Sequence, residues 1–199
     1  MKRLFDASLA GAGLVCSAPL WLFFAAAIKL EDGGPVFYAQ ERVGLRGRVF
    51  TALKFRSMRP DAEAGVGAVQ AAENDPRATT IGRLMRATAM DELPQLWNIF
   101  RGDMSFVGPR ALRPGETEAA GGAIVEMNRV SGYAARIAVR PGLTGIDQIY
   151  APRDVPRRHK FRYDRLYVGR QSMWLDVRLI LLSFWISFRG TWESRDRKY

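Results

Sequence analysis

Residues 7–28 read ASLAGAGLVCSAPLWLFFAAAI, a long run without a charged side chain. A helix that spans the hydrocarbon core of a bilayer needs roughly 20 such residues, so this segment is long enough to enter a membrane. Lys2 and Arg3 precede the run, as in a secretory signal peptide, but no small-residue cleavage site follows the bulky Trp21–Phe24 stretch. The pattern therefore favours a membrane helix that stays in the protein.

Two features of this segment concern its path through the membrane. Basic residues lie on both sides of it, and positive charge tends to remain on the cytoplasmic side. Pro19 lies inside it, where a proline removes a backbone donor and kinks a helix, and the Ser17 hydroxyl can bond a freed carbonyl. We therefore predict that residues 1–31 form a re-entrant helix that returns to the face it entered. A spanning helix kinked at Pro19 is the alternative.

The composition narrows the classes of partner and site. The 199 residues include 30 Lys and Arg against 20 Asp and Glu, with a pI of about 10.3, which suits anionic lipid, nucleic acid or a phosphorylated substrate. Cys16 is the only cysteine, so an intramolecular disulfide and a cysteine zinc site are excluded. His159 is the only histidine, which excludes multi-histidine metal sites and any Ser-His-Asp triad without it.

The remaining pattern predicts a mostly α fold with a small β-hairpin, in which residues 32–199 form a compact catalytic domain. Strands are expected over 35–40 and 48–54, joined by a turn at 44–47. Loops are expected over 60–77 and 140–145, the first with a weak helix as its alternative. Helices are expected after a cap at Thr80, from Asp91 to Gly102, over 116–130 with a break at 121–122, over 155–168 and over 173–188. The last helix carries Trp174 and Trp185, which suits an amphipathic interfacial helix and a core helix equally.

Asp91 and Glu92 are adjacent carboxylates among arginines. At a helix N-cap, Asp91 would meet free backbone amides and the positive end of the helix dipole, which would keep it ionised. A capping role alone is the ordinary explanation. Two adjacent carboxylates can also share a divalent cation, or divide nucleophilic attack and proton handling between them.

Several basic side chains are candidate phosphate ligands. Arg110 follows Gly108-Pro109 and Arg140 precedes Pro141-Gly142, so each lies on a rigid turn that a ligand can approach closely. Lys54 and Arg56 stand at the end of the predicted hairpin, and Arg86 lies shortly before the acidic pair. A solvated basic surface is the alternative.

Several ordered blocks carry a resemblance: Lys2–Asp6 (KRLFD), Lys54–Met58 (KFRSM), Asp91–Asn98 (DELPQLWN), Gly102–Arg110 (GDMSFVGPR) and Arg140–Gly145 (RPGLTG). Together they resemble the bacterial sugar transferases, the monotopic phosphoglycosyl transferases that begin the assembly of lipid-linked glycans. The resemblance extends from Lys2 to about Arg189 and matches the minimal form of these enzymes.

The resemblance implies a specific reaction. Asp91 would attack the sugar-linked phosphorus of a nucleotide diphosphate sugar, usually a UDP-sugar, releasing UMP and forming a covalent phosphosugar. A polyprenol phosphate, expected to be undecaprenyl phosphate, would then take the sugar phosphate in the first membrane step of exopolysaccharide, O-antigen or glycoprotein glycan synthesis. Mg2+ is expected at Asp91, and Glu92 would assist. Arg110 and Arg140 would hold phosphates, with Lys54, Arg56 and Arg86 as weaker candidates.

The resemblance also implies a location at one leaflet of the bacterial inner membrane, with the catalytic domain on the cytoplasmic face. No nucleic-acid partner is expected, and the sequence does not indicate an oligomeric state. Two other functions remain open at this point. One is a non-enzymatic, membrane-anchored basic module that binds anionic lipid or nucleic acid. The other is an enzyme in which the lipid phosphate attacks the UDP-sugar directly.

Three departures from the family pattern stand out. Ser17-Ala18-Pro19 replaces an adjacent Ser-Pro pair, and Ala111 replaces the usual proline after Gly-Pro-Arg. The block after Gly145 begins Ile146-Asp147-Gln148 where the commoner sequence is Trp-Ala-Gln. The last two departures concern sugar or nucleotide preference, and a role for Arg153 or Asp154 stays open.

Overall fold

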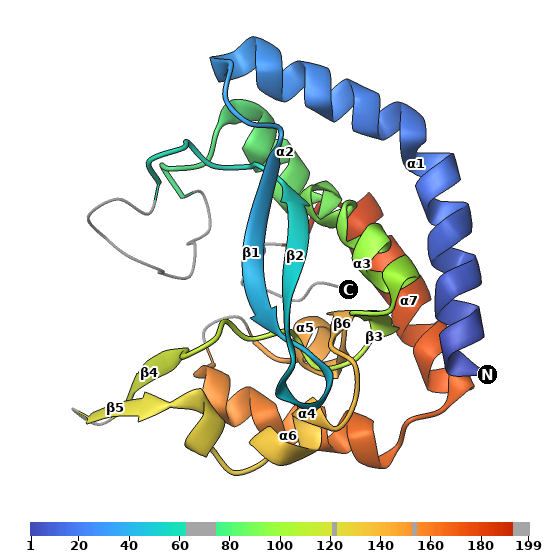
Figure 1. Cartoon of the computed structure of the whole chain (residues 1–199), viewed down its shortest axis with the longest axis vertical. Coiled ribbons are helices and arrows are strands. Elements are labelled where there is room, and N and C mark those ends of the chain that lie inside the picture. The colour runs from blue at the N-terminus through green and yellow to red at the C-terminus, as the bar shows by residue number, and fades with distance from the viewer. Residues whose placement is uncertain (63–74, 121–122, 153–154, 193–199) are drawn as a thin grey trace.

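The computed structural model describes residues 1–62, 75–120, 123–152 and 155–192, and the predictions for residues 63–74, for the break at 121–122 and for 153–154 lie outside these ranges. The fold is mostly helical with small pairs of strands, as predicted (Figure 1). The helices are α1 Lys2–Asp32, α2 Thr80–Ala87, α3 Gln95–Arg101, α4 Tyr133–Ile137, α5 Ile146–Tyr150, α6 Arg157–Gly169 and α7 Met173–Phe188, with short 3-10 turns η1 Leu45–Gly47, η2 Met90–Glu92 and η3 Met127–Arg129. The strands are β1 Phe37–Val43, β2 Val49–Phe55, β3 Ser105–Val107, β4 Thr117–Ala120, β5 Ala123–Glu126 and β6 Gly142–Thr144.

Helix α1 is continuous, and it bends as it passes along one side and over the end of the other elements (Figure 1). Pro19 lies inside it, and the Trp21 indole donates a hydrogen bond of 3.1 Å to the buried Ser17 hydroxyl. Gly33 ends the helix in the left-handed conformation, with its amide bonded to Lys29 O. Among the described residues, α1 is the one helix long and apolar enough to cross a membrane.

One face of α1 packs against the rest of the chain. Small residues allow close approach: a Cβ at Gly11 would lie 3.3 Å from the Phe100 ring, and one at Gly13 would lie 3.2 Å from Leu96 Cδ1. Phe24 and other residues of α1 pack with β2 and α2 in an apolar cluster that is separate from the main core. The opposite face remains apolar and exposed, through Leu4, Val15, Leu22, Phe23 and Leu30.

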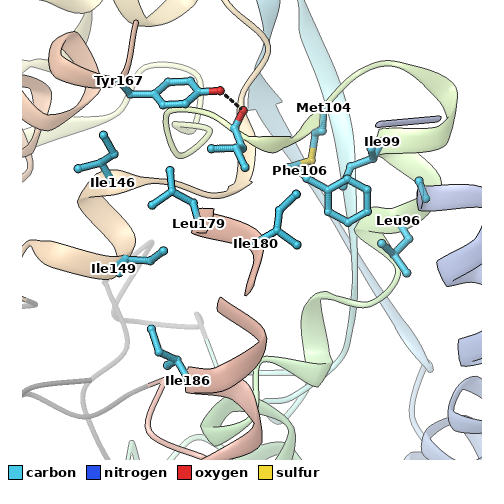
Figure 2. Packing of buried hydrophobic residues seen from close by; sticks show 12 residues of the cluster. Leu96, Ile99, Met104, Phe106, Ile146, Ile149, Tyr167, Leu179, Ile180 and Ile186 are labelled. Carbon is cyan, nitrogen blue, oxygen red and sulfur yellow. Dashed lines mark hydrogen bonds between the residues drawn. The ribbon is translucent and has the colours of Figure 1, made fainter. Parts of the chain in front are cut away.

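The main core lies where α7 meets α3, α5 and the β3–β6 pair (Figure 2). Leu179 and Ile186 of α7 are fully buried there, and Leu96 and Ile99 reach it from α3. The helix predicted over 173–188 is confirmed. Its other side carries exposed Trp174, Leu181, Phe184, Trp185 and Phe188, so it combines a core face with an apolar outer face.

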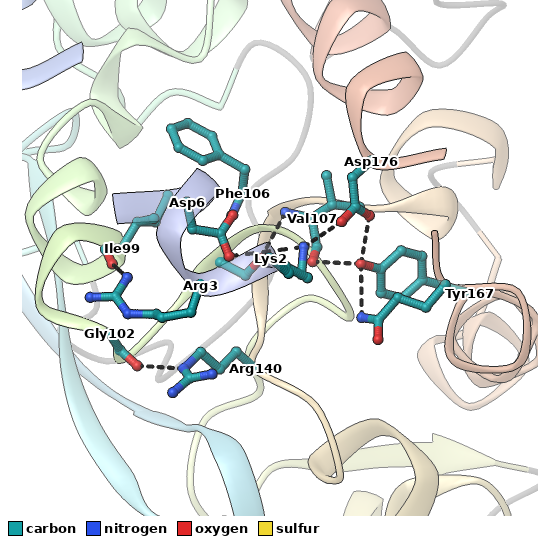
Figure 3. Close-up of polar contacts among 12 residues, drawn as sticks. Lys2, Arg3, Asp6, Ile99, Gly102, Phe106, Val107, Arg140, Tyr167 and Asp176 are labelled. Carbon is teal, nitrogen blue, oxygen red and sulfur yellow. Dashed lines mark hydrogen bonds and ion pairs between the residues drawn. The ribbon is translucent and has the colours of Figure 1, made fainter. Parts of the chain in front are cut away.

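A buried polar network holds the start of α1 (Figure 3). Lys2 Nζ lies 2.6 Å from Asp176 Oδ2 in α7, and Asp6 Oδ1 accepts a hydrogen bond from the Phe106 amide in β3. The Tyr167 hydroxyl lies 2.8 Å from Asp176 Oδ1 and 2.9 Å from Val107 O. Residues 2–6, which carry part of the family resemblance, thus anchor α1 to the rest of the chain.

Other sequence predictions have mixed outcomes. The hairpin β1–β2 is confirmed in antiparallel register, and the charged helix appears as α6. Residues 116–130 were predicted as a helix, which is wrong: β4 and β5 pair as a hairpin instead. Thr117, Ile124 and Val125 are β-branched, and their strand preference outweighs the helix formers around them. The loop predicted over 140–145 contains β6.

Two predicted helix caps are also wrong. Thr79 caps α2 in place of Thr80, accepting a bond from the Gly82 amide. Asp91 lies in the 3-10 turn η2, and α3 begins only after Pro94, which stands at its N-cap. Asp91 therefore does not cap α3.

The strands β3 and β6 run parallel and come into very close contact through glycine. A Cβ at Gly142 would lie 2.1 Å from Gly108 N and 2.3 Å from Thr144 O, so no side chain fits. We expect Gly142→Ala to lower the free energy of unfolding by about 2–3 kcal/mol, because backbone must move to admit the methyl group. Thermal and denaturant unfolding of the detergent-solubilised protein measures this.

Gly169→Ala is the matched control. A Cβ there meets no described atom within 4 Å, and the residue lies inside α6 without a positive φ. Its stability should equal or slightly exceed that of the parent. Equal stability of the two variants would contradict the close approach of β3 and β6.

Candidate active site

The acidic pair lies on a strained turn between α2 and α3. Ala89, just before η2, has the left-handed φ of 56° that residues other than glycine rarely adopt. This conformation ends the α2 segment abruptly and turns Asp91 and Glu92 inward, where each residue is only 7% exposed. Backbone strain and two buried carboxylates at one position mark this turn as a candidate site.

A cavity of about 800 Å³ opens in front of the pair. Its size suits a ligand of the dimensions of a nucleotide sugar. Its walls come from β1, β2, α2, η2, the segment after β3, the start of β4, and helices α4, α5 and α6. The basic residues in its lining are Arg42, Lys54, Arg56, Arg59, Arg77, Arg86, Arg110, Arg113, Arg136, Arg157 and Lys160. They outnumber the acidic ones, so the cavity favours an anionic ligand.

The two carboxylates have different electrostatic surroundings. Lys54 Nζ contacts Glu92 Oε1 directly but stays 3.9 Å from Asp91 Oδ2, and Arg110 Nη2 lies 3.5 Å from Glu92 Oε1. Burial raises the pKa of Asp91 to about 6, with the Glu92 charge adding to the rise and Lys54 opposing it. Burial also disfavours the charged form of Glu92, but Lys54 and Arg110 outweigh it and lower the pKa of Glu92 to about 2.

These values separate the roles of the pair. Glu92 stays ionised at neutral pH, so it is suited to holding Lys54 and Arg110 in place and not to proton transfer. Asp91 is the less stabilised anion, and it titrates close to the working pH of a cell.

The structure brings most of the predicted basic residues to one cavity. Lys54 and Arg110 contact the acidic pair. Arg86 lines the same cavity, and its charge acts on Asp91. Arg56 lines the cavity, but its guanidinium binds both oxygens of Asp32 and the Pro35 carbonyl, which ties β2 to the end of α1.

Arg140 has a different position. Its Nε donates a 2.8 Å hydrogen bond to Gly102 O at the end of α3 (Figure 3), and it is not among the described residues that line the cavity. A phosphate-binding role for Arg140 stays a prediction, to which this geometry adds no support.

Sequence reasoning missed a set of charged residues deeper in the cavity: Arg42, Arg113, Arg136, Asp147, Arg157, Lys160 and Asp164. Arg136 donates to Arg110 O, lies 3.6 Å from Asp164 and stacks 4.3 Å above the Phe161 ring. It therefore supports the segment that carries Arg110. The parallel pairing of β3 with β6 would have pointed to this region, since ligands bind at the carboxyl ends of parallel strands.

The acidic pair also bears on magnesium binding. Within the described ranges, no group of three or more His, Cys, Asp or Glu side chains could cage a metal ion. Mg2+ commonly uses one or two carboxylates together with substrate phosphates. Asp91 fits that pattern, because it lines the cavity and burial opposes its negative charge, so a cation beside it would favour the ionised form.

The sequence is similar to several known proteins. It is 42% identical over 185 residues to an exopolysaccharide production protein of Rhizobium leguminosarum bv. phaseoli, covering 90% of this chain and 91% of the relative. It is 42% identical over 189 residues to an undecaprenyl-phosphate glucose phosphotransferase of Komagataeibacter xylinus, covering 92% of this chain and 35% of that longer protein. It is 40% identical over 185 residues to a UDP-glucose:undecaprenyl-phosphate glucose-1-phosphate transferase of Caulobacter vibrioides, covering 90% and 67%.

The match to a family extends over nearly the whole chain, and it includes the acidic pair, the Arg110 segment and the start of α1. Residues 1–190 match the family described as bacterial sugar transferase. This chain therefore belongs to the bacterial sugar transferase family.

Proposed function

We propose that this protein transfers a sugar-1-phosphate from a UDP-sugar to undecaprenyl phosphate through a covalent intermediate on Asp91. The observation that carries the proposal is the acidic pair. Asp91 and Glu92 both face a large basic cavity, but the pKa of Asp91 is raised and that of Glu92 is lowered. The names of the Komagataeibacter and Caulobacter relatives support the donor and the acceptor, and they favour glucose as the sugar. The name of the Rhizobium relative supports a place in exopolysaccharide synthesis.

In the first step, a carboxylate oxygen of Asp91 attacks the sugar-linked phosphorus of the UDP-sugar. A bond forms between this oxygen and phosphorus, and the bond from phosphorus to the bridging oxygen breaks. UMP leaves with the electron pair, so no proton has to move. Anion approaches anion in this step, which is why the nearby charges of Lys54, Arg86 and Arg110 are required.

In the second step, an oxygen of the lipid phosphate attacks the phosphorus held by Asp91. The new bond gives a polyprenol diphosphate sugar, and the bond to the Asp91 oxygen breaks, so the carboxylate is regenerated. Glu92 keeps Lys54 and Arg110 in place through both steps. A bound Mg2+ would supply further positive charge to the diphosphate.

The geometry of α1 supports a re-entrant path, in which both ends of the helix lie on one face of the membrane. Its first turn is fastened by Lys2 to Asp176, and its last turn is fastened by Asp32 to Arg56. Glu31 also accepts a hydrogen bond of 3.1 Å from the Ile81 amide. Both ends of α1 thus attach to the catalytic domain. If the two ends lay on opposite sides of a bilayer, one of these attachments would have to break.

The exposed apolar residues of α1, α3 and α7 suit the membrane interface. Trp97 and Phe100 of α3 stack on one another, as do Trp185 and Phe188 of α7, and all four are exposed. Aromatic side chains of this kind favour the headgroup region. This arrangement would present the cavity to a lipid phosphate at the surface of the membrane.

Asp91→Asn should abolish the covalent adduct and reduce exchange of label between UMP and UDP-glucose, in the absence of lipid, by at least about a thousandfold. An amide lacks the anionic oxygen that attacks phosphorus. Intact-protein mass spectrometry measures the adduct, and the exchange assay measures the half-reaction. Asp103→Asn is the control, since Asp103 pairs with Arg101 and is not among the described residues that line the cavity. Full exchange by Asp91→Asn would refute the covalent step.

The rate of adduct formation should depend on pH through Asp91. Only the carboxylate attacks, and its pKa is raised to about 6, so the rate should be near its plateau above pH 7 and fall about tenfold per unit well below pH 6. Following the adduct, and not exchange, avoids titration of the UMP phosphate, whose second pKa is also about 6.

Glu92→Gln should move this acidic limb to lower pH. Removing the Glu92 charge removes a contribution that raises the pKa of Asp91, and it frees Lys54 to approach Asp91. A limb that stays in place or moves to higher pH in Glu92→Gln would exclude Asp91 as its origin.

The re-entrant path has its own test. In a Cys16→Ser background, a cysteine added before Met1 and one at the exposed position of Leu30 should both react with a membrane-impermeant maleimide from the same side of sealed vesicles. Glu126→Cys, in the exposed β5 hairpin, reports the side of the catalytic domain. Labelling of the two α1 ends from opposite sides would establish a spanning helix.

A further inference from the structure

Asp147 and Arg110 lie at the same edge of the parallel strand pair. Arg110 lies just beyond the carboxyl end of β3, and Asp147 lies just beyond the carboxyl end of β6. A bridge between Arg110 and Gly142 keeps the two segments together. Burial disfavours the charged form of Arg110, but the charges of Glu92 and Asp147 outweigh it and raise the pKa of Arg110. The charge of Arg110 acts on Asp147 in turn. Asp147 therefore belongs to the same part of the cavity as the proposed phosphate ligand.

The carboxylate of Asp147 is buried without full hydrogen bonding. The residue is 7% exposed and lines the cavity, and its Oδ1 atom has no hydrogen-bond partner within the described parts of the chain. Burial raises the pKa of Asp147, and its cationic neighbours Arg136, Arg110 and Lys160 oppose this rise. Arg136 already binds Asp164 and the Arg110 carbonyl, and Arg110 already faces Glu92. A buried acceptor without a partner is costly, so such a group is expected where a ligand supplies the missing donor.

We propose that Asp147 recognises a hydroxyl group of the nucleotide sugar. This inference rests on the proposed function, and it adds a specificity-determining residue to the same site. In its ionised form this carboxylate only accepts hydrogen bonds, so it repels phosphate and selects a donor. Hydroxyl groups are the donors that flank the phosphates of a nucleotide sugar. The torsion about the Cβ–Cγ bond is broad and roughly two-fold, so the two oxygens of Asp147 can exchange places. The hydroxyl belongs either to the transferred sugar or to the ribose.

The test pairs the side chain with single hydroxyl groups of the ligand. Binding of UDP-glucose is measured in an Asp91→Asn background, which removes turnover, together with binding of analogues that each lack one hydroxyl of the glucose or of the ribose. One analogue should bind about 10- to 100-fold more weakly than UDP-glucose, as expected for a hydrogen bond to a charged group. After Asp147→Ala is added, that analogue and UDP-glucose should bind equally well, whereas the ratios for the other analogues should not change.

The outcome identifies the source of the hydroxyl. Loss of discrimination for a glucose hydroxyl assigns Asp147 to the transferred sugar, and loss for a ribose hydroxyl assigns it to the nucleoside. Unchanged ratios for every analogue would overturn the proposal. Asp103→Asn, which removes a carboxylate outside the cavity, should leave all ratios unchanged.

Two further measurements keep the proposal testable. Asp147→Asn preserves the shape of the side chain, and its unfolding temperature separates a binding effect from a folding defect. If neither Asp147 variant folds, the analogue series on the Asp91→Asn protein can still overturn the proposal, through the absence of any hydroxyl worth tenfold in affinity. The binding readout needs no reaction, so failure of adduct formation in the parent protein would refute the proposed function separately.

Discussion

The fold depends on polar contacts that anchor the two ends of the apolar helix α1. Helix α1 has one face packed against α3 and α2 and an outer face of exposed apolar residues. Packing alone would permit such a helix to slide or rotate, because apolar contacts are not directional. The buried ion pair between Lys2 and Asp176 and the bond from Asp6 to the Phe106 amide remove that freedom at one end. The Asp32–Arg56 pair removes it at the other end.

These polar contacts also position the residues that face the acidic pair. Arg56 directly follows the strand β2 that carries Lys54, and Lys54 contacts Glu92. At the other end of α1, Asp6 holds β3, and the segment after β3 carries Arg110. Both attachments of α1 are thus a few residues from a group that faces the acidic pair. A helix that enters lipid would in this way fix the height of the cavity relative to the membrane surface.

The outcome of the sequence predictions follows from the range of the interactions involved. The apolar run of α1, the β1–β2 hairpin and α7 were predicted because their signals are local. Residues 116–130 were predicted wrongly because the pairing of β4 with β5 decides between helix and strand there. The sequence marks Asp147 only as a departure from a family pattern and predicts no role for it. Its position beside Arg110 results from pairing between strands more than thirty residues apart in sequence, which no local pattern reports.

Asp91 illustrates the same limit at the level of one side chain. A helix cap would have held its carboxylate as a well-stabilised anion, whereas the 3-10 turn leaves it buried with its charge opposed. Glu92 takes the direct contact with Lys54 and the closer approach of Arg110, and so it draws their stabilisation away from its neighbour. A carboxylate that was strongly paired would be a weak nucleophile, and one with a much higher pKa would be protonated in the cell and a poor leaving group in the second step. A pKa near 6 lies between these limits, since the group is ionised at neutral pH and still weakly enough stabilised to attack. The acidic pair is therefore best understood as one reactive carboxylate and one that controls the cations around it.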